Sequence, residues 1–212
     1  MKLKLSILAL VICTLVSAQG KKKAPRSSKK GRGNLPTNFW VKKTSKSRKL
    51  YAQSIKCDVG GTLTLNMGKT MGKTITSKVT AGRYVRVGTP KTAAIKAIDT
   101  AMNSGKWAAV ISKSTAYLSK NAWLGWGGYV GYMKGKAQLA KKDIVGAERT
   151  FKAAEKYAKV GKPAYYAKIK RGSIEALLAN KKYDAAEKKL KKVRRTPENR
   201  PFIYVTKGKV LE

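Results

Sequence analysis

The sequence lacks the side chains on which most catalytic and metal sites depend. Its 212 residues contain no histidine, so no Ser-His or Cys-His pair is available to activate a nucleophile. Asp58 and Asp99 have no partner carboxylate nearby. Of the two cysteines, Cys13 lies in the apolar run near the start of the chain, so Cys57 with scattered acids does not make a metal site. We therefore expect a protein that is not an enzyme and that binds no cofactor and no metal.

Four other acids have the spacing of ion pairs within a helix. A lysine follows each of them four residues later, in the pairs Glu148 and Lys152, Glu155 and Lys159, Asp184 and Lys188, and Glu187 and Lys191. Such pairs are typical of the solvent-exposed side of a helix. The spacing predicts helix surfaces and not acid-base chemistry.

The sequence GKTMGKT at residues 68–74 is similar to a phosphate-binding loop but departs from it in two respects. Such a loop needs four residues between its first glycine and the Gly-Lys-Thr, whereas three separate Gly68 from Gly72. It must also join a strand to a helix, and the residues after Thr74 have the pattern of a strand. We expect no nucleotide site here.

Positive charge is the dominant feature of the composition. Lysine and arginine total 48 against ten acids, for a formal net charge of +38, and only ten of the 48 are arginine. The excess attracts anionic partners, and lysine favours diffuse attraction where arginine favours bidentate recognition. The composition predicts an acidic protein or an anionic polymer as partner, with an ordinary solvated basic surface as the alternative.

Helical repeats are the elements that would position these charges. Residues 134–195 contain one pattern twice, with apolar residues at i, i+4 and i+7 on one face of a helix: Ala147, Phe151 and Ala154, then Ala186, Leu190 and Val193. Each copy has a preceding helix, and residues 94–118 offer a third, more degenerate unit. Three helical hairpins are therefore predicted, with turns near Gly105, Asp143 and Lys182, and stacking would give them a shared core.

These units resemble the tetratricopeptide repeat family over residues 92–197, most closely at Ala147, Phe151 and Ala154. No unit has the early Trp of that family followed by Leu-Gly in register. The resemblance implies antiparallel helix pairs stacked into a superhelix with a concave binding face, and it implies no chemistry. In that register the candidate partner-binding residues are Tyr129, Tyr132, Lys136, Lys168 and Arg171.

Three glycines, Gly127, Gly131 and Gly135, fall four residues apart in an aromatic stretch. They predict a flat helix face that packs closely between the first two hairpins. Membrane helices also use this spacing, but the apolar run is too short to favour that alternative. After residue 197 the sequence predicts a short element or a further helix, with Phe202, Ile203 and Val205 covering the last hairpin.

Residues 1–18 have the three parts of a secretory signal peptide: Lys2 and Lys4, an apolar run of 12 residues, and small residues ending at Ala18. We expect cleavage before Gln19, with an uncleaved anchor as the alternative. The predicted localisation is exported: periplasmic, cell-envelope or extracellular.

Residues 19–49 contain 12 lysines and arginines and no acid. They are predicted to be a disordered basic segment, either a solubilising tail or a polyanion-binding arm. Phe39 and Trp40 are its only apolar anchors. The candidate polyanion-binding residues are Lys21, Lys22, Lys23, Lys29 and Lys30.

Residues 50–89 change to short alternating runs rich in Thr and Val. Strands are predicted at residues 62–67, 75–79 and 84–87, which makes a small β-rich module. Cys57 alternates with Ile55 and Val59, which favours a buried thiol over pairing between chains.

The predicted fold is α+β and predominantly α. A TPR-like α-solenoid of three hairpins over residues 90–212 follows the signal peptide, the basic segment and the β-rich module. The first functional hypothesis is an exported scaffold that binds an acidic protein. The second is a cationic protein that binds an anionic polymer, such as a surface polysaccharide, lipid head groups of a membrane surface or, less favoured, extracellular nucleic acid.

Overall fold

A computed structural model describes residues 39–43, 46–58, 60–70, 73–80, 86–160, 165–194, 196–197 and 199–211. The chain is mostly helical there, with two small antiparallel sheets, and so agrees with the predicted α+β class. The predicted signal peptide and the five candidate polyanion-binding lysines lie outside the described residues. Their predictions stay untested.

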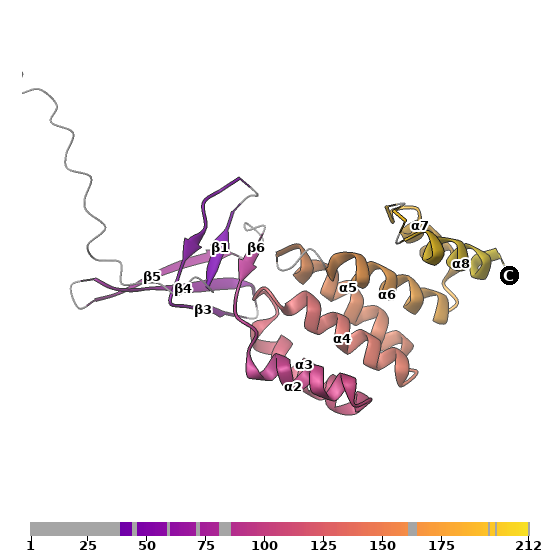
Figure 1. The fold of residues 1–212 in the computed structure, drawn as a ribbon, viewed down its shortest axis with the longest axis horizontal. Helices are drawn as coiled ribbons and strands as arrows, with labels where there is room; N and C mark the ends of the chain where they lie inside the picture. Colours follow the sequence, from indigo (N-terminus) through magenta and orange to yellow (C-terminus); the bar gives the residue numbers. More distant parts are fainter. Residues whose placement is uncertain are drawn as a thin grey trace, which may run out of the picture. The chain divides into compact units, whose positions relative to one another are not determined.

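Six short strands form the two sheets (Figure 1). One sheet has the order β2-β1-β6, from Leu50–Tyr51, Trp40–Lys42 and Arg86–Gly88. The other has the order β3-β4-β5, from Ser54–Cys57, Thr62–Thr70 and Lys73–Thr80. The predicted strands at residues 62–67 and 75–79 are confirmed, and β6 covers the described part of the third.

The β-rich module begins earlier than predicted. Val41 on β1 is fully buried and pairs with Val87 on β6, so a strand lies inside the segment that was expected to be disordered up to residue 49. The prediction was wrong at this end because the three apolar residues from Phe39 to Val41 are too few to stand out against the surrounding lysines. One of their two partner strands, the two-residue β2, is itself too short to recognise, and the other, β6, lies more than forty residues further along the chain.

The GKTMGKT sequence lies in the hairpin between β4 and β5. Lys69 pairs with Thr74 and Thr70 with Lys73 across the two antiparallel strands. The chain continues from Lys73 in β5, where a phosphate-binding loop would lead into a helix. The strand predicted after Thr74 is therefore confirmed.

Cys57 is half-buried at the end of β3, and its thiol donates a hydrogen bond to the backbone carbonyl of Asp58. Burial raises the pKa of the Cys57 thiol above its usual value, which keeps it in the less reactive protonated form. Ile55 beside it is buried, as expected, whereas Val59 lies outside the described residues.

Seven helices follow the module in the described part of the chain (Figure 1). Three antiparallel pairs are α2 and α3, α4 and α5, and α6 and α7, and α8 comes last. Their bounds are Ala93–Asn103, Trp107–Asn121, Gly127–Ala140, Ile144–Val160, Tyr166–Ala179, Tyr183–Leu190 and Arg200–Leu211.

The three hairpin turns lie where the sequence predicts them. Each turn contains one residue in the left-handed region: Gly105 at φ 65°, Lys142 at φ 62° and Lys181 at φ 56°. A left-handed residue reverses the chain after a helix and satisfies its last carbonyl groups. The same local solution therefore recurs in all three turns, with glycine in only one of them.

The packing of α4, α5 and α6 depends on glycines that face large or rigid neighbours. A methyl group added at Gly135 would lie 2.6 Å from the Phe151 ring, and one added at Gly172 would also lie 2.6 Å from it. Phe151 is fully buried, so its ring fills the space between these two glycines. Nearer the start of α4, Gly128 and Gly131 lie against Ala158 and Ala154 of α5.

This packing confirms that the glycine-rich stretch makes close helix contacts, but the predicted neighbour was wrong. Gly131 and Gly135 face α5, the second helix of their own hairpin, and not the first hairpin, whereas Gly127 faces the backbone carbonyl of Ala122 in the preceding turn. Gly128 takes the third position on the α5 side. Gly127 is the first residue of α4, so its surroundings are determined by the turn that precedes this helix. The spacing of the three glycines does not reveal this turn.

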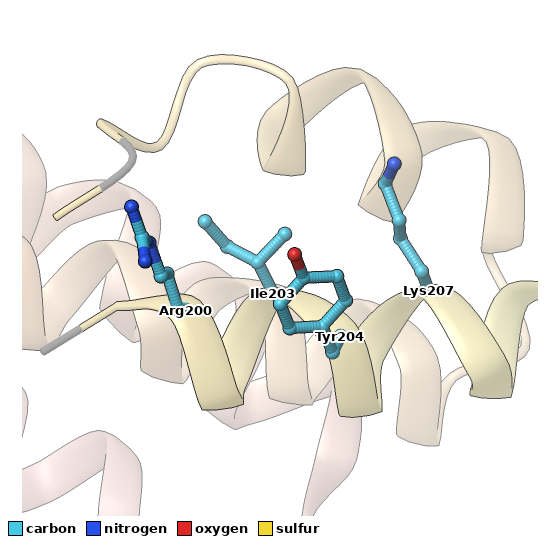
Figure 2. Close-up of a pocket in the computed structure, with 4 residues that line it drawn as sticks. All are labelled: Arg200, Ile203, Tyr204 and Lys207. Carbon is cyan, nitrogen blue, oxygen red and sulfur yellow. The ribbon is translucent and has the colours of Figure 1, made fainter. Parts of the chain in front are cut away.

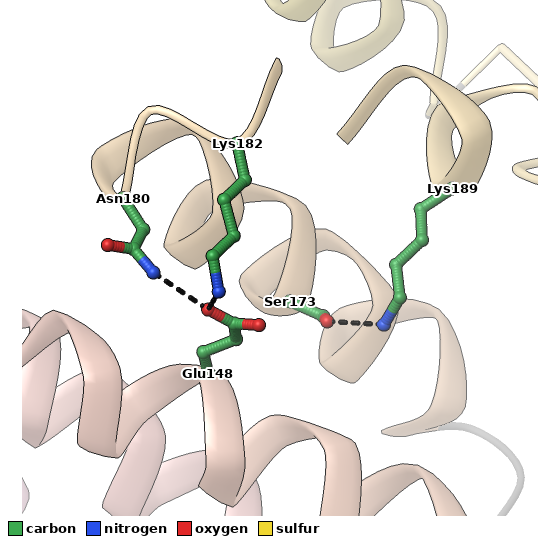
Figure 3. Close-up of polar contacts among 5 residues, drawn as sticks. All are labelled: Glu148, Ser173, Asn180, Lys182 and Lys189. Carbon is green, nitrogen blue, oxygen red and sulfur yellow. Dashed lines mark hydrogen bonds and ion pairs between the residues drawn. The ribbon is translucent and has the colours of Figure 1, made fainter. Parts of the chain in front are cut away.

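Two of the four acids that were predicted to pair within a helix pair instead with lysines of the next hairpin. Glu148 pairs with Lys182 at 2.9 Å and also accepts a hydrogen bond from Asn180 (Figure 3). Glu155 pairs with Lys189 at 2.7 Å. Lys189 also donates to Ser173 on α6 at 2.6 Å. Only Glu187 and Lys191 form the predicted pair within a helix, at 2.8 Å.

The correction for Glu148 and Glu155 has a geometric cause. A lysine four residues later lies on the same helix, but the neighbouring hairpin also places cations, Lys182 and Lys189, within ion-pair distance of these carboxylates. The two pairs therefore hold α5 against the next hairpin, and they are part of the packing of the helices.

Phe151→Ala tests the central contact of the helical core. Removing a fully buried ring leaves a cavity between Gly135 and Gly172, and we expect the free energy of unfolding to fall by about 3 to 5 kcal/mol. Urea denaturation followed by circular dichroism measures this. A loss below about 1 kcal/mol would place the ring outside the core.

Gly128→Ala should destabilise the protein even though alanine favours a helix. The new methyl group would lie 2.8 Å from the Ala158 Cα, a backbone atom that cannot rotate away, so overpacking of about 1 to 3 kcal/mol should exceed the gain in helix propensity. Gly208→Ala on α8 is the matched control, because nothing lies within 4 Å of its new methyl group. The two variants should shift Tm in opposite directions; equal shifts would contradict close packing at Gly128.

Glu148 should make stability depend on pH. Its pKa lies below the usual value because Lys182 and then Asn180 donate hydrogen bonds to the carboxylate. A depressed pKa stabilises the fold above the unfolded value of 4.5, and this contribution is lost as pH falls through the folded value. Glu148→Gln should therefore cost up to about 1 kcal/mol at neutral pH, and the cost should shrink as the pH falls from about 5 toward 2.

Lys182→Gln provides the cross-check by urea denaturation over the same pH range. It should lower stability by a similar amount at neutral pH, and combining it with Glu148→Gln should add little further loss, because both remove one interaction. Fully additive losses would mean that the pair does not interact.

Candidate partner-binding face

Tyr129, the first candidate partner-binding residue, lies in the core. Its hydroxyl donates a hydrogen bond to Asp99 on α2, and Lys91 forms an ion pair with the same carboxylate. The Tyr129 ring packs 5.6 Å from that of Trp126 and 4.7 Å from that of Tyr165, and burial raises the pKa of its hydroxyl. The prediction was wrong for this residue, since its side chain holds α4 against α2.

Tyr132 and Lys136 lie one and two turns further along α4. The Tyr132 ring is half-buried, 6.3 Å from the Phe151 ring. Lys136 Nζ forms an ion pair with Glu175 Oε2 on α6 at 3.2 Å, and both side chains are about two-fifths exposed. Lys136 is therefore accessible, but much of its charge is compensated within the protein.

Lys168 and Arg171 lie on α6 and have different surroundings. Lys168 is exposed, with its Nζ 5.9 Å from the centre of the Tyr165 ring. Arg171 is half-buried, donates to the side-chain oxygen of Asn199, and places its guanidinium 5.6 Å from the Phe202 ring. Arg171 therefore positions the start of α8. Of the five predicted residues, all of them within the described part of the chain, Lys168 is the one that is exposed and takes part in none of the ion pairs found there.

A pocket on α8 is a candidate site that the sequence analysis did not predict. Its volume is about 430 Å³, and the described residues that line it come from one side of α8 (Figure 2): Arg200, Ile203, Tyr204 and Lys207. Ile203 is 7% exposed and belongs to the core with Ile174 and Leu190, whereas Tyr204 is 71% exposed. The pocket thus combines an apolar base, an accessible aromatic ring and two cations.

A signal for this pocket was present in the sequence. Residues 200, 203, 204 and 207 have the i, i+3, i+4, i+7 spacing of one helix face. Three of the ten arginines fall in the seven residues from Arg194 to Arg200 of a chain otherwise dominated by lysine. Assigning the region after residue 197 only as a possible cover for the last hairpin left this face unexamined.

The charges of the pocket are not neutralised by an ion pair with an acid in the described part of the chain. The five ion pairs found there use Lys91, Lys136, Lys182, Lys189 and Lys191. Near the pocket, the pKa of Glu187 lies below its usual value, chiefly because Lys191 donates a hydrogen bond to it, with a smaller contribution from the charge of Lys207. Arg200 and Lys207 are therefore available to an external anion.

The described residues contain no group of three His, Cys, Asp or Glu side chains that could hold a metal ion. Within the same residues no helix is long and apolar enough to cross a membrane. The α8 pocket and Lys168 can bind carboxylate or similar anionic groups through hydrogen bonds and charge. Ile203 and Tyr204 offer an apolar contact beside them.

No protein-family model, curated protein or solved structure matches the chain.

Proposed function

We propose that the helical part of this protein is a TPR-like scaffold, exported and without enzymatic activity, that binds an acidic segment of a protein partner along α6 and α8. The observation that carries the proposal is the pocket lined by Arg200, Ile203, Tyr204 and Lys207. Proteins bind acidic peptides with this combination of a guanidinium fork, an ammonium group and an aromatic anchor.

Three features support the stacked-repeat architecture. The hairpins repeat the same left-handed turn, and Phe151 packs between the first helices of two successive units, near Gly135 and Gly172. The pairs Glu148 with Lys182 and Glu155 with Lys189 join α5 to the next hairpin, as contacts between neighbouring units of a stack would. In such a stack α4, α6 and α8 are first helices and share one face.

Arginine at the pocket supports a carboxylate as the bound group. The guanidinium of Arg200 can donate two parallel hydrogen bonds to one carboxylate, whereas Lys207 and Lys168 add attraction without fixed direction. Ile203 and Tyr204 would contact an apolar residue beside the acid. The favoured ligand is therefore a peptide in which Glu or Asp residues flank a Leu or Phe.

The composition favours a second candidate function, which is binding of an anionic polymer by diffuse charge. With 48 basic residues against ten acids, much of the positive charge has no acid to pair with. In that case affinity should follow the number of charges removed, wherever they lie, and residues 19–38 should contribute most because they contain many lysines close together.

The test compares two variants of equal charge in their binding to a fluorescein-labelled peptide, Glu-Asp-Glu-Leu-Glu-Asp-Phe-Glu. Arg200→Glu/Lys207→Glu removes the pocket charges, and Lys113→Glu/Lys120→Glu makes the same change on exposed positions of α3. We expect the pocket variant to lose at least about tenfold in affinity at 150 mM salt, because it loses directed hydrogen bonds, and the α3 variant to lose less than about threefold. Fluorescence anisotropy gives both values.

Two further proteins separate the alternatives. A chain without residues 19–38 should keep most of its affinity for the peptide, and the deletion stops there because β1 begins at Trp40. Equal losses for the two charge variants, with a large loss on deletion, would contradict the scaffold and support diffuse binding.

A further inference from the structure

The sheet of β2, β1 and β6 has one apolar and one basic face. Val41 and Val87 are opposite each other and buried, at 0% and 3% exposed, so they define the inner face. Side chains alternate along a strand, which puts the residues on either side of them on the outer face. The outer pairs are Lys42 with Arg86 and Trp40 with Gly88, and Tyr51 of β2 lies opposite Trp40 on its other side.

Lys42 and Arg86 form a like-charged pair directly across two antiparallel strands. Residues in such positions have their Cβ atoms about 4.5 to 5.5 Å apart, and like charges there are destabilising. In the described part of residues 39–88 the only acid is Asp58, and its carboxylate already accepts a hydrogen bond from the Thr62 backbone amide at 2.7 Å. None of the ion pairs among the described residues includes Lys42 or Arg86.

A third cation lies on the same face. Lys49 Nζ is 4.7 Å from the centre of the Trp40 ring, and this ring lies directly over Gly88, where a methyl group would come within 2.2 Å of it. Trp40 pairs with Gly88 next to the pair of Lys42 and Arg86. Trp40 therefore lies between the pair of Lys42 and Arg86 and the ammonium group of Lys49, which is over its ring.

We propose that this outer face, made of Lys42, Lys49, Arg86 and Trp40, is a binding site for the sulfate groups of a sulfated polysaccharide. A sulfate between Lys42 and Arg86 would turn their mutual repulsion into two attractive contacts. The site is separate from the α8 pocket, and it does not depend on the proposed scaffold function.

A sulfated polysaccharide fits this face better than a single-stranded nucleic acid does. Nucleic-acid platforms of this kind stack successive bases on open aromatic rings. Trp40 is half-buried, with Gly88 and Lys49 against its ring, so it offers little open surface for a base. This face can therefore bind a polymer through contacts of Lys and Arg with its charged groups, without base stacking. The predicted export would expose the protein to surface polysaccharides.

The test uses the full chain and a heparin octasaccharide as the probe, with affinity measured by calorimetry at several salt concentrations. Lys42→Gln/Arg86→Gln should bind the octasaccharide at least about fivefold more weakly than the wild type. The slope of log affinity against log salt concentration should become less steep by about 1 to 2. Lys113→Gln/Lys120→Gln on α3 removes the same charge and should change both quantities less. Residues 19–38 are present in all three proteins and contribute equally.

Thermal unfolding without heparin distinguishes loss of the site from loss of the fold. Because the substitution removes a like-charged pair, Lys42→Gln/Arg86→Gln should have a Tm equal to or above that of the wild type, and heparin should raise its Tm less. A lower Tm, equal losses of affinity in the two double variants, or tighter binding of a single-stranded oligonucleotide with the same number of charges would each overturn the proposal. Binding of the acidic peptide at α8 should be unchanged, so this proposal can fail without affecting the other.

Discussion

The ring of Phe151 is the contact on which the helical part depends. It is fully buried on α5 and lies against Gly135 of α4 and Gly172 of α6, so a single side chain sets the distance between three helices. Helices come this close only where a residue without a side chain faces a large one. The cross-hairpin ion pairs of Glu148 and Glu155 then fix the next hairpin relative to α5. The position of α8, and with it the pocket, follows from this stack through Arg171.

Scarcity of acids determines where positive charge remains accessible. Five of the acids in the described residues are held in ion pairs, mostly between helices, so the protein uses its few carboxylates to join elements. Cations far from these junctions keep their charge for external partners. Arg200 and Lys207 on α8, and Lys42 and Arg86 on the small sheet, are two such places, with different chemistry around them.

Sequence reasoning was accurate where a pattern is local. The helix pairs, the turns near Gly105, Asp143 and Lys182, and the strand from Thr62 follow from spacing along one element, and the structure has them. It failed where a distant segment decides. Tyr129 has the position of a surface residue in the repeat register, but Asp99 and Tyr165 enclose it. Val41 becomes a core residue through contacts with distant segments, among them Val87 on the paired strand and Leu124 after α3.

The core of the β-rich module contains residues from far along the chain. Leu124, after α3, and Val160, at the end of α5, are buried in one cluster with Val41, Leu63 and Leu65. During synthesis, β1 therefore emerges long before the last part of its core does. A strand that is still unpaired can form hydrogen bonds with a strand of another chain. Lysines on and beside the strands of this module oppose such pairing by electrostatic repulsion. The same charges that make this module attract anions would thus keep nascent copies apart until Val160 has been made.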